Sequence, residues 1–331
     1  MAEILLGALD IGGSKLAATI ANDQGPIARV VQATVKSGKP DALGQQCLAL
    51  LAAAGNAANI DIKEVASVGV SSCGPFAHQD GAIGLVAPNL CGGLTQENDL
   101  PNDWIFIPLE ATLRKQFSNV IIENDCIAAL TAERYFGAAQ AEPNSVYVTW
   151  STGVGFGLCV DGHILRGKHG NAGHAGHILL SEFSDALCGC GNRGDLEALV
   201  SGRNLAKHYA RAAEDIFTSA TAGDAASLNI VKDLAKWFGR GLYNLVTTLD
   251  TRCILVGGSV WRHHAELLSP FVEAEIHSRF PALTKGVTLR SAELDDLVAD
   301  IGALALVMPE SWVADWRISQ PWTKLQSLAL D

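Results

Sequence analysis

Short apolar runs alternate along most of the chain with stretches in which apolar residues recur at helical spacing. Short apolar runs bounded by turns indicate buried strands, whereas a spacing of three and four residues indicates helices. The pattern predicts strands at residues 4–9, 16–21, 65–71, 120–123, 146–149, 155–160 and 253–256. It predicts helices at residues 40–58, 126–137 and 226–249. This alternation is typical of an α/β fold with mainly parallel or mixed sheets.

Two segments lack such a pattern. Residues 212–225 are mostly small and polar, and we interpret them as a surface connection. The tail at residues 317–331 contains Pro321 and has Trp316 and Trp322 nearby, but its local pattern favours no single element.

The composition narrows the class of protein. With 48% hydrophobic and 18% charged residues, the chain has the content of a folded protein and not of a disordered one. A net charge of −11 disfavours binding to nucleic acid or to anionic membranes. No apolar run approaches the ~20 residues of a membrane-spanning helix, and the N-terminus lacks the basic region of a signal peptide. We therefore expect a cytoplasmic protein whose eight cysteines do not form a disulfide scaffold.

An apolar strand that ends in a glycine-containing turn occurs four times, in LLGALDIGGSK, VGVSSCGP, VTWSTGVGFG and ILVGGSV. Each copy also has Ser or Thr close to Gly. One such turn alone is often only a tight turn, but four of them favour a phosphate-bearing ligand held by backbone N–H groups. The repetition predicts two similarly built domains with the turns lining the cleft between them.

Two carboxylates follow predicted strands. Asp10 precedes a Gly-Gly-Ser-Lys turn whose spacing matches neither GxxxxGK[ST] nor GxGxxG, so the turn either binds nucleotide or is a plain hairpin. Asp125 precedes the helix expected at about residue 126. It is either the N-cap of that helix or a base that accepts a proton from a hydroxyl attacking phosphorus. Local sequence does not separate these roles.

A glycine-rich segment combines soft and hard metal ligands. His177, Cys188, Cys190 and Asp195 lie within about twenty residues, a donor set that suits a four-coordinate structural Zn²⁺ site. The alternative is a metal-free loop with reduced thiols. The Cys-x-Cys spacing is tighter than the usual one, yet the combination favours a metal.

Taken in order, these motifs resemble those of the ROK family of sugar kinases, which has the actin-like ATPase superfold. The resemblance extends from residue 6 to about residue 307 and rests on five elements. These are the first phosphate motif at Asp10, Gly12, Gly13 and Lys15; the segment Asn124-Asp125, which matches NDANAAA; the second phosphate motif at residues 151–157; the adenosine element at Val256-Gly257-Gly258-Ser259; and the zinc element at residues 170–177 and 188–197.

The resemblance implies two actin-like ATPase (ribonuclease H-like) α/β domains with mixed sheets flanked by helices and an interdomain cleft. We expect a small N-terminal domain at residues 1–118, completed by a C-terminal helix at about residues 305–331. A larger domain at residues 119–304 would carry the zinc loop. The family tendency also implies a homodimer or a higher oligomer.

The implied activity is transfer of the γ-phosphoryl group of MgATP to the C6 hydroxyl of a hexose or N-acetylhexosamine, with Asp125 as the base. The resemblance gives ATP and phosphate contacts to Asp10, Gly12, Gly13, Ser14, Lys15, Thr152, Gly153, Gly257 and Gly258. It gives sugar contacts to Gly74, Asn89, Asn124, Asp125 and His174. It gives structural Zn²⁺ to His177, Cys188, Cys190 and Asp195.

The chain departs from the family pattern at two positions. Asp195 replaces the third zinc cysteine, and because a carboxylate can ligate Zn²⁺ we expect the site to be retained. His174 replaces the glutamate of most ROK glucokinases and resembles the GHxGH motif of bacterial N-acetylmannosamine kinases. N-acetylmannosamine is therefore favoured over glucose or mannose, and a glucokinase or broad-specificity hexokinase is the alternative.

Two other classes of protein are alternatives to a kinase. A sugar-responsive regulator of this family carries a winged helix-turn-helix before the first phosphate motif, which here begins within ten residues of the N-terminus. A sugar-binding pseudokinase is disfavoured by intact Asp10, Asp125 and Thr152-Gly153. The expected ligands are a sugar and ATP, without nucleic acid or membrane partners.

Overall fold

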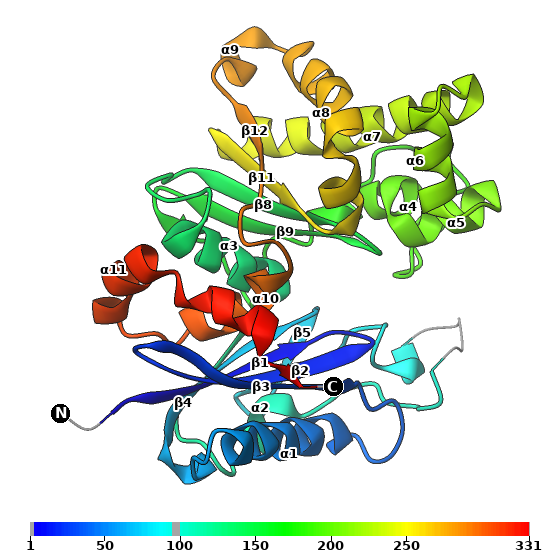
Figure 1. Cartoon of the computed structure of the whole chain (residues 1–331). Coiled ribbons are helices and arrows are strands. Elements are labelled where there is room, and N and C mark those ends of the chain that lie inside the picture. Colours follow the sequence, from blue (N-terminus) through cyan, green and yellow to red (C-terminus); the bar gives the residue numbers. More distant parts are fainter. Residues whose placement is uncertain (1–2, 95–99, 331) are drawn as a thin grey trace. The chain divides into compact units, whose positions relative to one another are not determined.

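The computed structural model describes residues 3–94 and 100–330 (Figure 1). It divides into two compact units. The first comprises Met1–Gly137, Arg166–Ala172 and Asp296–Asp331, and the second comprises Ala138–Leu165 and Gly173–Asp295. We had expected the first boundary after residue 118. In the structure it lies at Gly137, because strand β7 (Val120–Asn124) pairs with β4 (Val65–Ser72) within the first unit. Helix α3 (Asp125–Phe136) also packs against α10 (Val298–Ala305) there.

The first unit contains a six-stranded mixed sheet in the order β13-β3-β2-β1-β4-β7. The hairpins β1–β2 and β2–β3 are antiparallel, whereas β1–β4, β4–β7 and β3–β13 are parallel. The strands are β1 (Leu5–Ile11), β2 (Lys15–Asn22), β3 (Gly25–Ala33), β4 (Val65–Ser72), β7 (Val120–Asn124) and β13 (Ala329–Leu330). A separate ribbon pairs β5 (Phe76–Gln79) with β6 (Ala82–Leu85).

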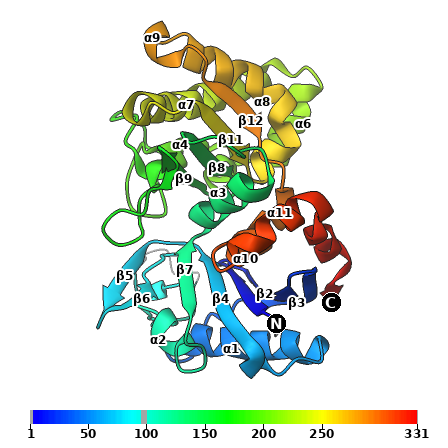
Figure 2. The same cartoon turned by 90° about the vertical axis from the view of Figure 1, so that its left-hand side faces the viewer.

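Helices cover both faces of this sheet (Figures 1 and 2). Helix α1 packs against β2 and β3, and α10 packs against β1, β4 and α3. Helix α10 packs so closely on β4 that a Cβ added at Gly69 would lie 1.8 Å from the Ala303 carbonyl oxygen. Only glycine therefore fits at this position. The helices are α1 (Ala42–Ala57), α2 (Leu109–Leu113), α3 (Asp125–Phe136), α10 (Val298–Ala305) and α11 (Glu310–Ser319).

The second unit contains a five-stranded sheet in the order β10-β9-β8-β11-β12. Its strands are β8 (Ser145–Trp150), β9 (Val154–Val160), β10 (His163–Ile164), β11 (Cys253–Gly257) and β12 (Thr288–Ser291). The strands predicted at residues 146–149 and 155–160 correspond to β8 and β9, which pair antiparallel as a hairpin. The helices are α4 (Leu196–Val200), α5 (Gly202–Tyr209), α6 (Ala213–Thr221), α7 (Ala225–Leu249), α8 (Ser259–His277) and α9 (Pro281–Thr284).

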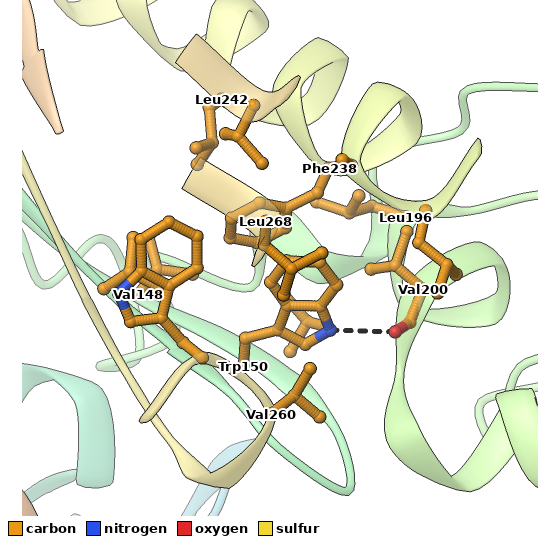
Figure 3. Close-up of a cluster of buried hydrophobic side chains, with 14 of the residues drawn as sticks. Val148, Trp150, Leu196, Val200, Phe238, Leu242, Val260 and Leu268 are labelled. Atoms are coloured by element: carbon orange, nitrogen blue, oxygen red, sulfur yellow. Dashed lines mark hydrogen bonds between the residues drawn. The ribbon is translucent and has the colours of Figure 1, made fainter. Parts of the chain in front are cut away.

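Trp150 lies at the centre of the core of the second unit (Figure 3). Its ring stacks on Phe238 of α7 at a centroid distance of 4.0 Å, and its Nε1–H donates to the Val200 carbonyl oxygen at 2.8 Å. This hydrogen bond satisfies the one polar atom of a fully buried indole. It also fixes the end of α4 against the end of β8, where the second phosphate motif begins.

Two expectations from the sequence were wrong. Residues 212–225 are not merely a surface connection, because α6 forms within them and buries Ile216, Phe217 and Ala220. Residues 305–331 are not one helix. Helix α11 is followed by a 3-10 segment at Pro321–Ser327 and by the edge strand β13. The tail is held instead by aromatic packing, since the rings of Phe136 and Trp322 lie 4.9 Å apart.

Among the described residues, no helix is both long and apolar enough to span a membrane. All eight cysteines lie in the described part of the chain, and none of them forms a disulfide there.

Candidate functional site

The first phosphate motif forms the turn between β1 and β2. Asp10 lies on β1, and the turn closes through the Gly12 N–H, which donates to the Lys15 carbonyl oxygen at 2.9 Å. Thr34, which follows β3, stabilises the turn with two hydrogen bonds. Its hydroxyl donates to the Gly12 carbonyl oxygen at 2.8 Å, and its N–H donates to the Ser14 carbonyl oxygen at 3.0 Å. The turn is therefore a hairpin in form, and this does not conflict with a role in binding phosphate.

Asp10 lies in an acidic environment. Burial and the nearby carboxylates of Asp300 and Asp125 raise the pKa of Asp10 from its ordinary value of 3.8 to about 7, against the opposing effect of Arg29. The buried Asp300 accepts both Nε–H and Nη2–H of Arg29 at 3.0 Å and the Thr19 hydroxyl at 2.8 Å. An arrangement that makes a carboxylate costly to ionise is one that favours a bound cation.

We expect Asp10→Asn to change how stability depends on pH. Unfolded Asp10 loses its proton near pH 3.8, whereas the native residue keeps it to about pH 7. The stability that this proton contributes is therefore lost as the pH rises from about 4 to about 7, and the loss amounts to about 4 kcal/mol. Urea unfolding at pH 5 and pH 8 in the presence of EDTA measures this, and the variant should lack that part of the decline. Equal pH dependence of both proteins would contradict a protonated native Asp10.

Asn124 and Asp125 begin α3 at the end of β7. Asn124 is the N-cap, because its side-chain oxygen accepts the Cys126 N–H at 3.0 Å. The N-cap role considered for Asp125 therefore belongs to its neighbour. Asp125 is the first residue of α3, is half-buried, and its Oδ1 also lies 2.8 Å from the Cys126 nitrogen. The carboxylate of Asp125 therefore lies at the positive end of the α3 helix dipole.

Asn89 and Gly74 lie close to this acidic group. A Cβ at Gly13 would lie 3.1 Å from Asn89 Nδ2, so the side chain of Asn89 packs on the first phosphate turn. The same nitrogen lies 3.4 Å from the sulfur of Cys73, the residue that precedes Gly74. Burial, and then the charges of Asp125 and Asp10, raise the pKa of the Cys73 thiol to about 12, so the segment before Gly74 lies near both carboxylates.

The remaining phosphate and adenosine residues lie together in the second unit. Thr152 and Gly153 form the turn between β8 and β9, and Gly257 of β11 pairs beside Thr149 of β8. Gly258 has a φ of +87° and precedes α8, and a Cβ there would lie 2.5 Å from the Trp150 carbonyl oxygen. The N-terminus of the nineteen-residue α8 therefore lies beside the turn, an arrangement that suits an anion.

His174 lies in the second unit, just before the short 3-10 helix Ala175–His177. The preceding segment Arg166–Ala172 belongs to the first unit. Asn171 fixes this segment, because its Oδ1 accepts the Phe76 N–H at 2.7 Å and its Nδ2 donates to the Phe76 carbonyl oxygen at 2.8 Å. Arg166 pairs with Glu123, next to the N-cap of α3.

The four predicted zinc ligands form one cluster whose ligand atoms lie within 4.8 Å of one another. His177 Nδ1 lies 3.7 Å from Cys188 Sγ, 3.5 Å from Cys190 Sγ and 3.2 Å from Asp195 Oδ2. Cys190 Sγ lies 3.5 Å from the same carboxylate oxygen. Tetrahedral Zn²⁺ bonds of about 2.0–2.3 Å place neighbouring ligand atoms about 3.3–3.8 Å apart, so these residues fit that ion.

Charges inside the cluster also favour a cation. Burial raises the pKa of the Cys188 thiol, and the carboxylates of Glu197 and Asp195 raise it further. Burial opposes ionisation of Asp195, but hydrogen bonds with His177 and the Ala198 N–H hold its pKa below the usual range. The Asp195 hydrogen bond raises the pKa of His177. A bound divalent ion would stabilise the thiolate that these neighbours disfavour.

Two features were not foreseen as part of a site. Glu197 is the last residue of the zinc element and has no assigned role in the sequence analysis, yet its carboxylate contacts both Val154 and Cys188. The Arg29–Asp300 ion pair joins positions 271 residues apart, and no local signal in the sequence connects them.

The known proteins that this chain resembles point to one family. The profile described as the ROK family matches residues 6–310. An N-acetylmannosamine kinase from Shigella boydii is 35% identical over 262 residues, which cover 76% of this chain and 82% of that protein. A xylose repressor from Bacillus spizizenii is 30% identical over 238 residues, which cover 68% of this chain and only 62% of the repressor.

Solved structures have the same fold. A ROK family glucokinase from Streptomyces griseus, crystallised with glucose and AMPPNP, is 25% identical with a TM-score of 0.66, and the match covers 91% of this chain and 97% of that one. Such neighbours are sugar kinases of the actin-like ATPase fold. The ordered motifs, the mixed sheets and the family match agree, and the chain belongs to the ROK family.

Proposed function

We propose that this protein is an ATP-dependent sugar kinase that phosphorylates the C6 hydroxyl of a hexose or N-acetylhexosamine. The observation that carries the proposal is the placement of Asp125, at the start of α3 and electrostatically coupled to Asp10 beside the first phosphate turn. Similarity to an N-acetylmannosamine kinase and to a glucokinase that binds glucose and AMPPNP supports it.

In the proposed reaction, the Asp125 carboxylate accepts the proton of the C6 hydroxyl as that oxygen attacks the γ-phosphorus. A new O–P bond forms, and the bond from the γ-phosphorus to the β–γ bridging oxygen breaks, so that ADP leaves with the bonding electrons. Asp10 binds the magnesium of the MgATP substrate. Backbone N–H groups of the two glycine turns and the N-terminus of α8 stabilise the phosphate charge.

The zinc ligands have a structural role in this proposal. His177, Cys188, Cys190 and Asp195 would hold the ion, which ties the loop at residues 177–195 to the start of α4. A structural Zn²⁺ contributes to folding and takes no part in phosphoryl transfer.

A coupled ADP-release assay across glucose, mannose, fructose, allose, N-acetylglucosamine and N-acetylmannosamine tests the proposal. We expect sugar-dependent ADP release, fastest with N-acetylmannosamine. Sugar binding without any ADP release would contradict the proposed kinase activity and would support a sugar-responsive regulator or a pseudokinase. The regulator is a relevant alternative because the chain is also similar to a xylose repressor.

We expect His174→Glu to shift the substrate preference toward glucose. A neutral imidazole offers one donor and one acceptor, whereas a carboxylate only accepts hydrogen bonds, so the two side chains favour different groups at C2. The ratio of kcat/KM for glucose to that for N-acetylmannosamine should rise at least about tenfold, or ~1.4 kcal/mol. His163→Glu, at an exposed position in the same unit, is the control. If the ranking of the sugars by kcat/KM does not change, His174 does not determine substrate specificity.

A further inference from the structure

Ser71 is the seventh residue of β4, the strand that lies between β1 and β7 in the sheet of the first unit. Its side chain is fully buried, and in the described part of the chain its Oγ is the one buried side-chain oxygen or nitrogen without a hydrogen-bond partner. Its neighbour Ser72 is equally buried, but the Ser72 hydroxyl donates to the Cys73 carbonyl oxygen at 3.1 Å. Because buried polar groups are nearly always paired, the hydroxyl of Ser71 needs an explanation.

The register of the sheet places Ser71 beside Asp10. In the two parallel pairings of β4, Ser71 lies opposite Asp10 of β1 and opposite Glu123 of β7. Each of the three is the next-to-last residue of its strand. Paired residues point to the same face of a sheet, and neighbouring strands lie about 4.8 Å apart. The three side chains therefore form one row near the carboxyl ends of the strands.

This row lies on the face of the sheet that α10 covers. Gly69 is two residues before Ser71 and so on the same face, and it packs against Ala303 of α10. Asp300 of the same helix adds negative charge near Asp10. The Ser71 hydroxyl is thus a neutral polar group, buried among carboxylates at the point where the first phosphate turn begins.

The chemistry of Asp10 suggests what the hydroxyl binds. Glu123 is already paired with Arg166, whereas Asp10 is the residue assigned above to the magnesium of MgATP. When only one or two carboxylates hold Mg²⁺, the ion keeps several of its water molecules. Each of these waters donates hydrogen bonds and needs acceptors, and a serine hydroxyl has two lone pairs that can accept.

We propose that Ser71 is a positioning residue for the metal of the nucleotide substrate, because its hydroxyl accepts a hydrogen bond from a water molecule bound to the Mg²⁺ that Asp10 holds. The hydroxyl is unpaired in the free protein and gains its partner when MgATP binds. This role rests on the proposed kinase function, since the metal enters with ATP.

Calorimetric titration with AMPPNP, in the presence of Mg²⁺ and again in EDTA, tests the proposal. In Ser71→Ala the Kd for MgAMPPNP should rise about fivefold to tenfold, because one hydrogen bond to a polarised water is lost. The Kd for AMPPNP in EDTA should change by less than about twofold. Ser72→Ala is the matched control, because it removes an equally buried hydroxyl from the opposite face of the same strand. Both of its Kd values should stay within about twofold of wild type.

Thermal unfolding shows whether the hydroxyl has a structural role instead. Removing an unpaired buried hydroxyl also removes the penalty of its desolvation, so Ser71→Ala without nucleotide should unfold at or above the wild-type temperature. Saturating MgAMPPNP should then raise the unfolding temperature less in the variant than in wild type. A variant that unfolds at a lower temperature without nucleotide overturns the proposal, because its hydroxyl would already be paired in the free protein.

The remaining outcomes separate this proposal from the kinase function. Equal weakening of AMPPNP binding with and without Mg²⁺, or weakening of sugar binding alone, overturns the role of Ser71 in holding the metal. If wild-type protein binds MgAMPPNP and Ser71→Ala binds it equally well, the role of Ser71 is wrong and the kinase function stands. If wild-type protein binds no AMPPNP under either condition, the kinase function fails, and the role of Ser71 fails with it.

Discussion

Asp125→Ala is expected to lower kcat by about 10²–10⁴-fold while sugar affinity changes by no more than a few fold, because general-base catalysis contributes an effect of this size. The first position of α3 keeps this carboxylate half-buried at a helix N-terminus. Steady-state kinetics give kcat, and calorimetric titration with the sugar gives the affinity. Asp125→Asn should lose nearly as much rate, since it preserves the shape but cannot accept the proton.

Glu310→Ala is the matched control for this prediction. Glu310 is an exposed acid in the first turn of α11, also in the first unit, so its removal changes a helix-terminal charge away from Asp10. Its kcat should equal that of wild type. Turnover near the wild-type level in Asp125→Asn would show that neither the charge of Asp125 nor its capacity to accept a proton is needed, so that Asp125 is not the base.

Asp195→Ala should release zinc and destabilise the protein more than any other single change in the loop. Wild-type protein should contain about one zinc per chain, the number that one four-ligand site implies. The substitution removes a ligand and also the N-cap of α4, whose loss alone costs about 1 kcal/mol. Loss of an ion present at ~1,000 times its Kd adds about 4 kcal/mol. Elemental analysis and thermal unfolding measure the two effects.

Asp195→Cys separates the two roles of Asp195, as a metal ligand and as the N-cap of α4. A thiolate at residue 195 completes the family's set of cysteine ligands, so zinc content should stay near one per chain. The carboxylate oxygen that accepts the Ala198 N–H is lost, and unfolding should therefore show only the smaller destabilisation. A zinc-free wild-type protein that unfolds at the same temperature with and without a chelator would contradict a structural metal.

Most strands and long helices could be predicted because their pattern is local. The run at residues 65–71 and the long helix at 226–249 match β4 and α7 closely, since burial on a sheet or helix face leaves a regular period. Helix α6 was missed because few of its residues are strongly apolar, and its packing against α7 and other neighbouring helices stabilises it. Strand β13 was missed because an edge strand of two residues has no period to read.

In the candidate site, too, some features could be predicted from the sequence and others could not. Asp10, Asp125 and the four metal-cluster residues could be named in advance because each stands in a short motif with characteristic neighbours. The environment of Asp10 could not be predicted, since Asp300 and Arg29 reach it from distant segments that meet only when α10 packs on the sheet. The two contacts of Glu197 likewise depend on how α4 is docked.

By itself, the sequence determined the α/β class, the family resemblance and the residue types that can hold phosphate, sugar and metal, because these depend on local period and on ordered motifs. Only the tertiary structure decided that Asn124 caps α3, that Asp195 both caps α4 and faces His177, and that Glu197 accepts the Val154 N–H. Hydrogen bonds and charge effects act over a few ångströms, and those distances are set by packing between segments that the chain order leaves apart.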